Sequence, residues 1–450
     1  MTVKTIPTKL TFKFELFKIQ NSTKWPLEEI SKLDKNRLGN FVRSSTPQFR
    51  FSQLMDIIFY YSKHIQKNIN DLISIESIDS QTENYIIPIG VAYHPNDWTD
   101  LFNGKLTDKQ SIFEYIHPKF LIDLQNGKAM LLIDQSVEGY HTDWLWNWFH
   151  EKCTKYDISP RAIIYVTGDQ SSADTYAYWA HKNNIDTRLN IIPSTTLSFY
   201  INQTYIQRNL NIVFDDLLKY KQDNVSKIYL YDCINFRPRP QRIFNYLHLK
   251  NAGLLPLGNI SIGTHPDWTV KLTSEQLKNY HLPLDIDTTI LPKTMEQVTP
   301  TNADHRYYEF VERILDNVYL NSWLSVVTES SYFEHERSVF ISEKTFKPIA
   351  CMQPFIIVGS KHVLKYLRKL GYKTFDGFID ESYDDLDDSE RFVAIVNALE
   401  KIKNIKDKVS WYKSMQEILE HNHKLFLSIR TTKCQEHIAV TKYYSNYFKD

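Results

Sequence analysis

Short hydrophobic runs alternate along the chain with stretches whose hydrophobic residues recur at helical spacing. Most of the runs are hydrophobic at nearly every position, which is typical of strands that are buried on both faces of a parallel sheet. We expect strands over residues 85–91, 129–134, 161–166, 227–232, 324–328 and 353–359. We expect helices over residues 144–156, 173–183, 240–252, 304–319, 362–370 and 391–402. This alternation predicts an α/β protein with two doubly wound halves.

The length of the chain suits more than one domain. At roughly 100 to 200 residues per domain, 450 residues make two or three. We place the boundary within residues 208–224, which gives an N-terminal domain over 1–220 and a C-terminal domain over 221–405. Residues 406–450 are expected to form helices that pack back on the N-terminal domain. The pattern also predicts a helix over 51–65, an extended connection over 264–302 and a solvated acidic loop over 380–390.

Composition narrows the class of protein. With 42% hydrophobic and 24% charged residues, the chain falls outside the disordered class. Its 53 basic residues balance 53 acidic ones, so the net charge does not favour binding to nucleic acid or to an anionic membrane. A local basic cleft is still compatible with this balance. The N-terminus lacks a signal-peptide pattern, and the widely spaced cysteines form no CxxC pair, so we expect a cytoplasmic location. The four are Cys153, Cys233, Cys351 and Cys434.

The segment over residues 324–360, LSVVTESSYFEHERSVFISEKTFKPIACMQPFIIVGS, carries the most informative chemistry. A buried strand ends at its TE pair, and the later SEKT sequence leads into a short helix whose first turn we expect to hold Pro348. Glu343, Lys344 and Lys347 then lie around a helix N-terminus at the carboxyl end of a parallel strand, where open α/β sheets bind ligands. A carboxylate for ribose hydroxyls beside lysines for phosphates suits a nucleoside diphosphate. An ordinary capped helix with exposed lysines is the alternative.

A cluster of arginines follows the strand over 227–232. Arg237, Arg239 and Arg242 lie in the sequence FRPRPQR, directly before a predicted helix. Arginine offers planar bidentate donors to phosphate, so the cluster is a candidate pyrophosphate clamp. Basic residues are common in loops, so the cluster alone is weak evidence for a phosphate site. The evidence is stronger because the SEKT segment lies in the same predicted domain.

These segments resemble a known family. SEKTFKPIACMQPFIIVG is similar to the donor-site signature of the α-1,3-fucosyltransferases. FRPRPQR upstream and LKYLRKLGYKTF and DESYDDL downstream extend the resemblance to fucosyltransferase-like glycosyltransferases of phages and large DNA viruses, over roughly residues 227–400. The resemblance implies a GT-B fold, in which two Rossmann-like domains face a cleft, the C-terminal domain binds the nucleotide-sugar and the N-terminal domain binds the acceptor. It also implies that Glu343 binds the ribose, Lys344 the phosphates and an arginine of the cluster the pyrophosphate. Lys347-Pro348 departs from the fucosyltransferase pattern, so the resemblance does not identify the donor sugar as fucose.

An inverting transferase also needs a general base, which the N-terminal half must supply. Glu138, and after it Asp134, follow the buried strand over 129–134 and are our candidates. A plain polar loop with a helix cap is the alternative for each of them. The loop over residues 166–179 is a second candidate to line the cleft.

The sequence therefore predicts an inverting, metal-independent glycosyltransferase with no cofactor beyond its nucleoside diphosphate sugar. The acceptor is either a saccharide or a hydroxylated base in viral DNA. A metal-dependent GT-A transferase is one alternative, since Asp285 and Asp287 form a DxD pair, although this pair is not placed at a strand end. A noncatalytic nucleotide-sugar-binding protein is the other.

Overall fold

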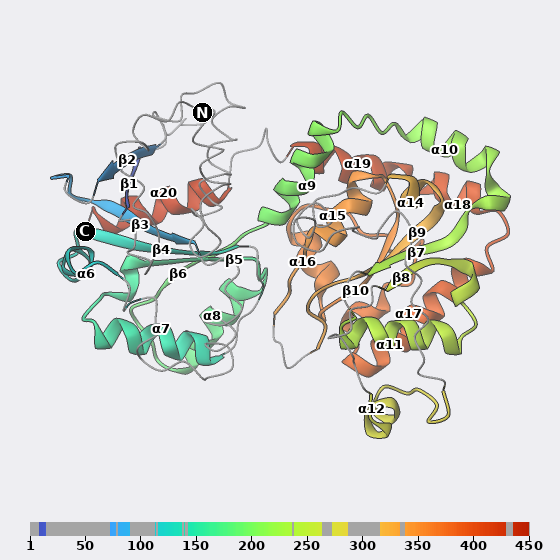
Figure 1. Ribbon diagram of the computed structural model, residues 1–450, viewed down its shortest axis with the longest axis horizontal. Coiled ribbons are helices and arrows are strands. Elements are labelled where there is room, and N and C mark those ends of the chain that lie inside the picture. The colour runs from blue at the N-terminus through green and yellow to red at the C-terminus, as the bar shows by residue number, and fades with distance from the viewer. Residues whose placement is uncertain are drawn as a thin grey trace, which may run out of the picture. The chain divides into compact units, whose positions relative to one another are not determined.

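The computed structural model describes residues 9–14, 73–77, 80–90, 113, 116–136, 139, 143–235, 238–262, 272–286, 316–333, 338–428 and 435–449. The chain divides into two compact units, the first made of residues 1–196 with 430–450 and the second of residues 197–429. Each unit contains one sheet (Figure 1), and every pairing between the described strands is parallel. The predicted α/β class is thus confirmed, and the division falls earlier in the chain than the expected 208–224.

The sheet of the first unit has six strands in the order β2-β1-β3-β4-β5-β6. The strands are β1 (Leu10–Phe14), β2 (Ile73–Ser77), β3 (Tyr85–Gly90), β4 (Ala129–Gln135), β5 (Ile163–Thr167) and β6 (Asn190–Pro193). The described helices of this unit are α6 (Pro118–Gln125), α7 (Asp143–Lys155), α8 (Ser172–Lys182) and α20 (Gln435–Tyr447). A 3-10 turn, Pro160–Ala162, precedes β5.

Alternate residues of these strands enter two separate cores, because successive side chains of a strand point to opposite faces of the sheet. Leu131 and Ile133 of β4 pack with hydrophobic residues of α7 and α8. Met130 and Leu132 pack on the other face with Val440 and Tyr444 of α20. The helix at the end of the chain therefore covers a sheet face formed by residues that lie some hundreds of positions earlier.

The second unit is built on a four-stranded sheet in the order β10-β9-β7-β8. Its strands are β7 (Tyr229–Asn235), β8 (Gly258–Ile262), β9 (Ser322–Thr328) and β10 (Phe355–Val358). Its helices are α9 (Thr196–Gln207), α10 (Phe214–Asp223), α11 (Pro240–Asn251), α12 (Ser274–Asn279), α14 (Asp316–Leu320), α15 (Glu343–Ala350), α16 (Val363–Lys369), α17 (Asp388–Lys403), α18 (Lys408–Ser414) and α19 (Gln416–Ser428). Short 3-10 turns cover Val225–Lys227, Leu255–Leu257 and Ser382–Asp385.

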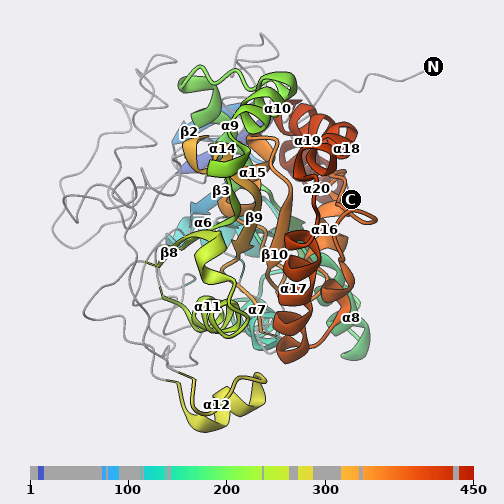
Figure 2. The same cartoon turned by 90° about the vertical axis from the view of Figure 1, so that its right-hand side faces the viewer.

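Helices cover both faces of this second sheet. α11 packs against α17 on one face, while α14 and α15 pack against β9 on the other, with α19 beyond α15 (Figures 1 and 2). The chain leaves β7 through α11 to reach β8 on one side, whereas β9 continues through α15 to β10 on the other side. The order of the strands thus reverses between β7 and β9. This is the topological switch point of a doubly wound sheet, the place where such sheets bind ligands at the carboxyl ends of their strands.

Several local expectations change with the structure. Pro348 lies at the sixth residue of α15 and not in its first turn, so the proline sits inside the helix. The acidic loop is not wholly solvated, because Asp384 is buried and its two oxygens accept hydrogen bonds from the backbone N–H groups of Leu364 and Lys365 at the start of α16. The expected helix over 51–65 lies outside the described residues.

Two further segments are described only in part. Residues 316–320 form α14 at the end of the helix expected over 304–319, whose remainder lies outside the described residues. Within 264–302, the described part contains α12, which begins at a capping box formed by Thr273 and Gln276.

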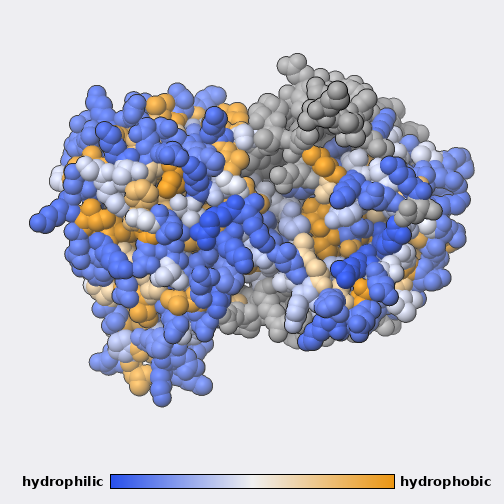
Figure 3. Space-filling model, turned by 180° about the vertical axis from the view of Figure 1, so that it is seen from behind, coloured by the Kyte–Doolittle hydropathy of each residue, from blue (hydrophilic) through white to orange (hydrophobic). Residues whose placement is uncertain are grey.

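In the view of Figure 3, hydrophilic side chains cover most of the described surface that faces the viewer, and hydrophobic ones are scattered among them. Among the helices that the structure describes, none has the length and hydrophobicity to cross a membrane.

Candidate functional site

The starts of α11 and α15 meet at the switch point of the second unit. Arg239, the N-cap residue of α11, donates from Nη1 to the backbone carbonyl of Ser330, 3.1 Å away. Gln241 of the same helix donates to the carbonyls of Glu329 and Ser330, at 3.0 and 2.9 Å. Hydrogen bonds from the first turn of α11, the helix after β7, therefore fix the position of the loop that follows β9.

Glu329 fixes the start of α15 in turn. Its side chain is fully buried and accepts hydrogen bonds from the backbone N–H of Ser342 at 3.0 Å, from the Ser342 hydroxyl, and from the Thr345 hydroxyl at 2.6 Å. Ser342 is also the N-cap of α15 and accepts from the backbone N–H of Lys344. Because these donors satisfy a buried carboxylate, the first turn of α15 is held in one position.

The charged side chains predicted from the sequence gather around this turn. Lys344 Nζ lies 2.7 Å from Glu343 Oε1 and 3.0 Å from the Ser342 hydroxyl. Burial of Glu343 on its own would raise its pKa, but Lys344 and Lys347 outweigh burial and lower the pKa to about 2. Glu343 is thus a buried carboxylate that stays ionised at neutral pH.

The arginines belong to the same electrostatic group. Arg242 is buried, and its burial, together with the neighbouring charge of Arg239, lowers its pKa to about 10, while Glu343 and Glu329 oppose the shift. The structure therefore brings Arg239, Arg242, Glu343, Lys344 and Lys347 together, as the sequence predicted. Of the two lysines, Lys347 is buried and Lys344 is partly exposed. Arg237 lies outside the described residues.

This arrangement suits an anionic ligand with hydroxyl groups. Two helices present the positive ends of their dipoles at the switch point, and arginine and lysine add full charges. The carboxylate of Glu343 can accept hydrogen bonds from hydroxyls. Sequence reasoning missed Glu329 and Gln241, although a glutamate directly after a buried strand was a usable signal.

The first unit has its own polar group at the carboxyl ends of its strands. Asp134 lies near the end of β4, is buried, and accepts a hydrogen bond from the backbone N–H of Ser136 at 3.0 Å. Its neighbours in the sheet register are Gly90 and Val166. Glu138, our first candidate base, lies outside the described residues.

Two other acidic residues of this edge were not singled out from the sequence. Asp169, in the loop after β5, is fully buried and accepts from the backbone N–H and the hydroxyl of Ser171 at the start of α8. Glu436, at the start of α20, accepts from the hydroxyl of Ser194 at 3.0 Å. A residue 242 positions from its partner gives no local signal in the sequence.

The DxD pair is placed only in part. Asp285 is exposed on the turn after α12 and does not end a strand, while Asp287 lies outside the described residues. Within the described ranges, no group of three or more His, Cys, Asp or Glu side chains could hold a metal ion.

In comparisons with known proteins, no family model, no curated protein and no solved structure matches the chain. The site must therefore be interpreted from its own geometry.

Proposed function

We propose that this protein is a GT-B-type glycosyltransferase that moves a sugar from a nucleoside diphosphate to an acceptor hydroxyl. The observation that carries the proposal is the group of Arg239, Arg242, Glu343 and Lys344 at the switch point of the second unit. Nucleotides bind α/β sheets at this point, with phosphate at a helix N-terminus and an acidic residue on the ribose. In our proposal Glu343 accepts the ribose hydroxyls, and the basic residues hold the diphosphate.

The basic residues would also offset the charge of the diphosphate as it leaves, which is the work of a metal ion in other transferases. We therefore propose an inverting, metal-independent reaction with a carboxylate base, Asp134 or Glu138, from the first unit. The acceptor is a saccharide or a hydroxylated base in viral DNA, and in duplex DNA that base would have to be flipped out of the stack. We place the enzyme in a reducing cytoplasm, since Cys153, Cys233 and Cys351 are unbridged.

Calorimetric titration with GDP, UDP and their sugar conjugates tests the donor site. We expect at least one diphosphate to bind, and no binding by any member of the panel would overturn the proposal.

Turnover is then measured in excess EDTA with an oligosaccharide and with hydroxymethylated DNA, and we expect one of the two to be modified. Binding without turnover on either acceptor would favour a noncatalytic nucleotide-sugar-binding protein. Activity lost in EDTA and restored by manganese would favour a metal-dependent transferase.

A further inference from the structure

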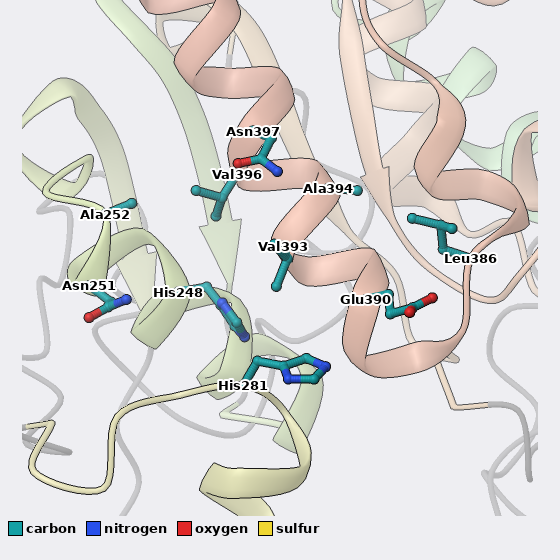
Figure 4. A pocket seen from close by; sticks show the side chains of 10 residues that line it. All are labelled: His248, Asn251, Ala252, His281, Leu386, Glu390, Val393, Ala394, Val396 and Asn397. Carbon is teal, nitrogen blue, oxygen red and sulfur yellow. The ribbon is translucent and has the colours of Figure 1, made fainter.

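A pocket lies between α11 and α17 in the second unit, with a volume of about 670 Å³. Its walls combine hydrophobic side chains with five polar ones (Figure 4). The polar residues are His248, Asn251, His281, Glu390 and Asn397. This size and mixture are typical of sites for small molecules.

The pocket is separate from the candidate donor site. Arg239 and Gln241 of the donor site lie at the start of α11, whereas His248 and Asn251 lie at its end. His248 lies nine positions after Arg239, which is about 13.5 Å along a helix that rises 1.5 Å per residue. A ligand in this pocket therefore does not need the donor site.

His248 is fixed and neutral. Its Nε2 donates to the carbonyl of Tyr280 at 2.9 Å, and its ring stacks on Phe392 with a centroid distance of 5.3 Å. Burial lowers the pKa of His248 to about 4, so the imidazole carries no charge at neutral pH. With the proton on Nε2, Nδ1 is a hydrogen-bond acceptor.

The other polar side chains of the pocket, those of Asn251, His281, Glu390 and Asn397, are exposed to solvent. In the described part of the chain, the side chains of Asn251, His281, Glu390 and Asn397 make no hydrogen bond and no ion pair. Glu390, Val393, Ala394 and Asn397 recur at helical spacing and form one stripe of α17 along the pocket. Polar side chains from two helices and a turn thus border one partly open hollow of mixed polar and hydrophobic lining.

His281 has an unusual backbone for its side chain. Its φ is 55°, in the left-handed region that glycine and asparagine favour, and it follows Tyr280, the C-cap of α12. Figure 4 shows its imidazole beside that of His248. Local structure alone would favour glycine or asparagine at this position.

We propose that this pocket binds a neutral, hydroxyl-rich ligand, namely a saccharide. Among the described residues, no lysine or arginine lines the pocket, which disfavours phosphates and nucleotides. A purely hydrophobic ligand would leave the polar side chains without partners. Sugar hydroxyls both donate and accept, so they can serve the Glu390 carboxylate, the His248 Nδ1 and the two carboxamides at once, while the C–H faces of the sugar pack on Val393 and Val396.

The proposal does not rest on the proposed transferase activity, and it is tested without any donor. Saturation-transfer-difference NMR is run on the full chain with glucose, galactose, mannose, N-acetylglucosamine, lactose and maltose. We expect at least one of these sugars to bind saturably and to remain bound when a nucleoside diphosphate is added. No saturable binding by any of them, or complete displacement by the diphosphate, would overturn the proposal.

Three variants locate the binding. Asn397→Ala and His281→Asn should each weaken the affinity for the bound sugar about threefold to tenfold, which is the loss of one hydrogen bond. Asn404→Ala, the same change one residue beyond α17 at an exposed position, should leave the affinity unchanged. His281→Asn should fold with unchanged or higher thermal stability, because asparagine tolerates the left-handed backbone. Equal affinities in all three variants would show that the sugar binds elsewhere and would overturn the proposal.

Discussion

At the scale of single residues, Glu343 gives the most direct test of the donor site. Glu343→Gln keeps the shape of the side chain and removes its charge. If the carboxylate accepts the ribose hydroxyls, the variant should bind the nucleoside diphosphate more weakly by about 1 to 3 kcal/mol. Calorimetric titration measures the change, with Glu400→Gln, a surface residue paired to Lys403, as the control. A folded Glu343→Gln protein with unchanged donor affinity would refute the role.

Glu343→Gln should also change how the stability of the protein depends on pH. The folded pKa of Glu343 is about 2, below its ordinary value of 4.5, so between these pH values the unfolded chain binds more protons than the folded one. The stability that the ionised Glu343 contributes is therefore present above about pH 4.5 and is lost as the pH falls towards 2. We expect the melting temperature to fall more in the native protein than in Glu343→Gln over this range. Parallel losses would show that Glu343 is not the group responsible.

The role of the arginine side chains is tested at Arg239, a half-buried residue that donates from Nη1 to the backbone carbonyl of Ser330. Arg239→Lys keeps the positive charge and loses the planar fork. If the fork stabilises the diphosphate mainly as it leaves, kcat should fall at least about tenfold while donor affinity changes little. Steady-state kinetics give the comparison, with Arg242→Lys measured in parallel and Arg368→Lys as a control on an arginine paired to Glu381. Negligible effects at both Arg239 and Arg242 would leave the cluster without a role in turnover.

At the scale of elements, the start of α15 depends on the hydrogen bonds around Glu329. Thr345→Val has nearly the same shape but removes the hydroxyl that donates to Glu329, leaving a buried carboxylate with one donor fewer. We expect the free energy of unfolding to fall by about 1 to 3 kcal/mol. Thr345→Ser keeps the donor and is the matched control, expected to lose less. The midpoint of urea unfolding measures both variants, and equal losses would show that the methyl group, not the hydroxyl, matters there.

At the scale of the whole molecule, α20 completes the core of the first unit. Val440 is fully buried against the sheet, whereas Ile438 of the same helix is 44% exposed. Val440→Asp would bury an unpaired carboxylate and should cost about 3 to 5 kcal/mol. Ile438→Asp places the same group in water and should change stability by no more than about 0.5 kcal/mol. Thermal unfolding of the two variants tests whether α20 packs on the sheet through Val440. Similar melting temperatures would contradict this packing.

The two units are also expected to divide the work of the reaction. Asp134→Asn keeps an oxygen that can accept from Ser136 and removes basicity, so if Asp134 is the base the rate should fall about 100-fold with donor affinity intact. Asp157→Asn, at an exposed position of the same unit, is the control. If turnover stays near normal, Glu138 is tested next by Glu138→Gln.

The sequence by itself determined the parts of the fold that local pattern encodes. The continuous hydrophobic runs that predicted β4, β5, β9 and β10 are strands in the structure, because burial on both faces demands hydrophobic residues at every position. The Ser-Glu-Lys turn predicted a helix start with Glu343 and Lys344 beside it, because capping depends on residues a few positions apart. The weaker strands β1, β2, β6 and β8 were not predicted. The sequence of β8, GNISI, contains too few hydrophobic residues to distinguish it from a loop.

Only the tertiary structure decided what depends on residues far apart in the chain. The order β10-β9-β7-β8 makes the switch point, and it pairs Tyr231 with Leu324 across a long stretch of sequence. The burial of Glu329, the clamp from Gln241 and the covering of the first sheet by α20 follow from such pairings. Their free energy comes from hydrophobic area and hydrogen bonds that exist only once distant segments pack together, so no short stretch of sequence carries their signal.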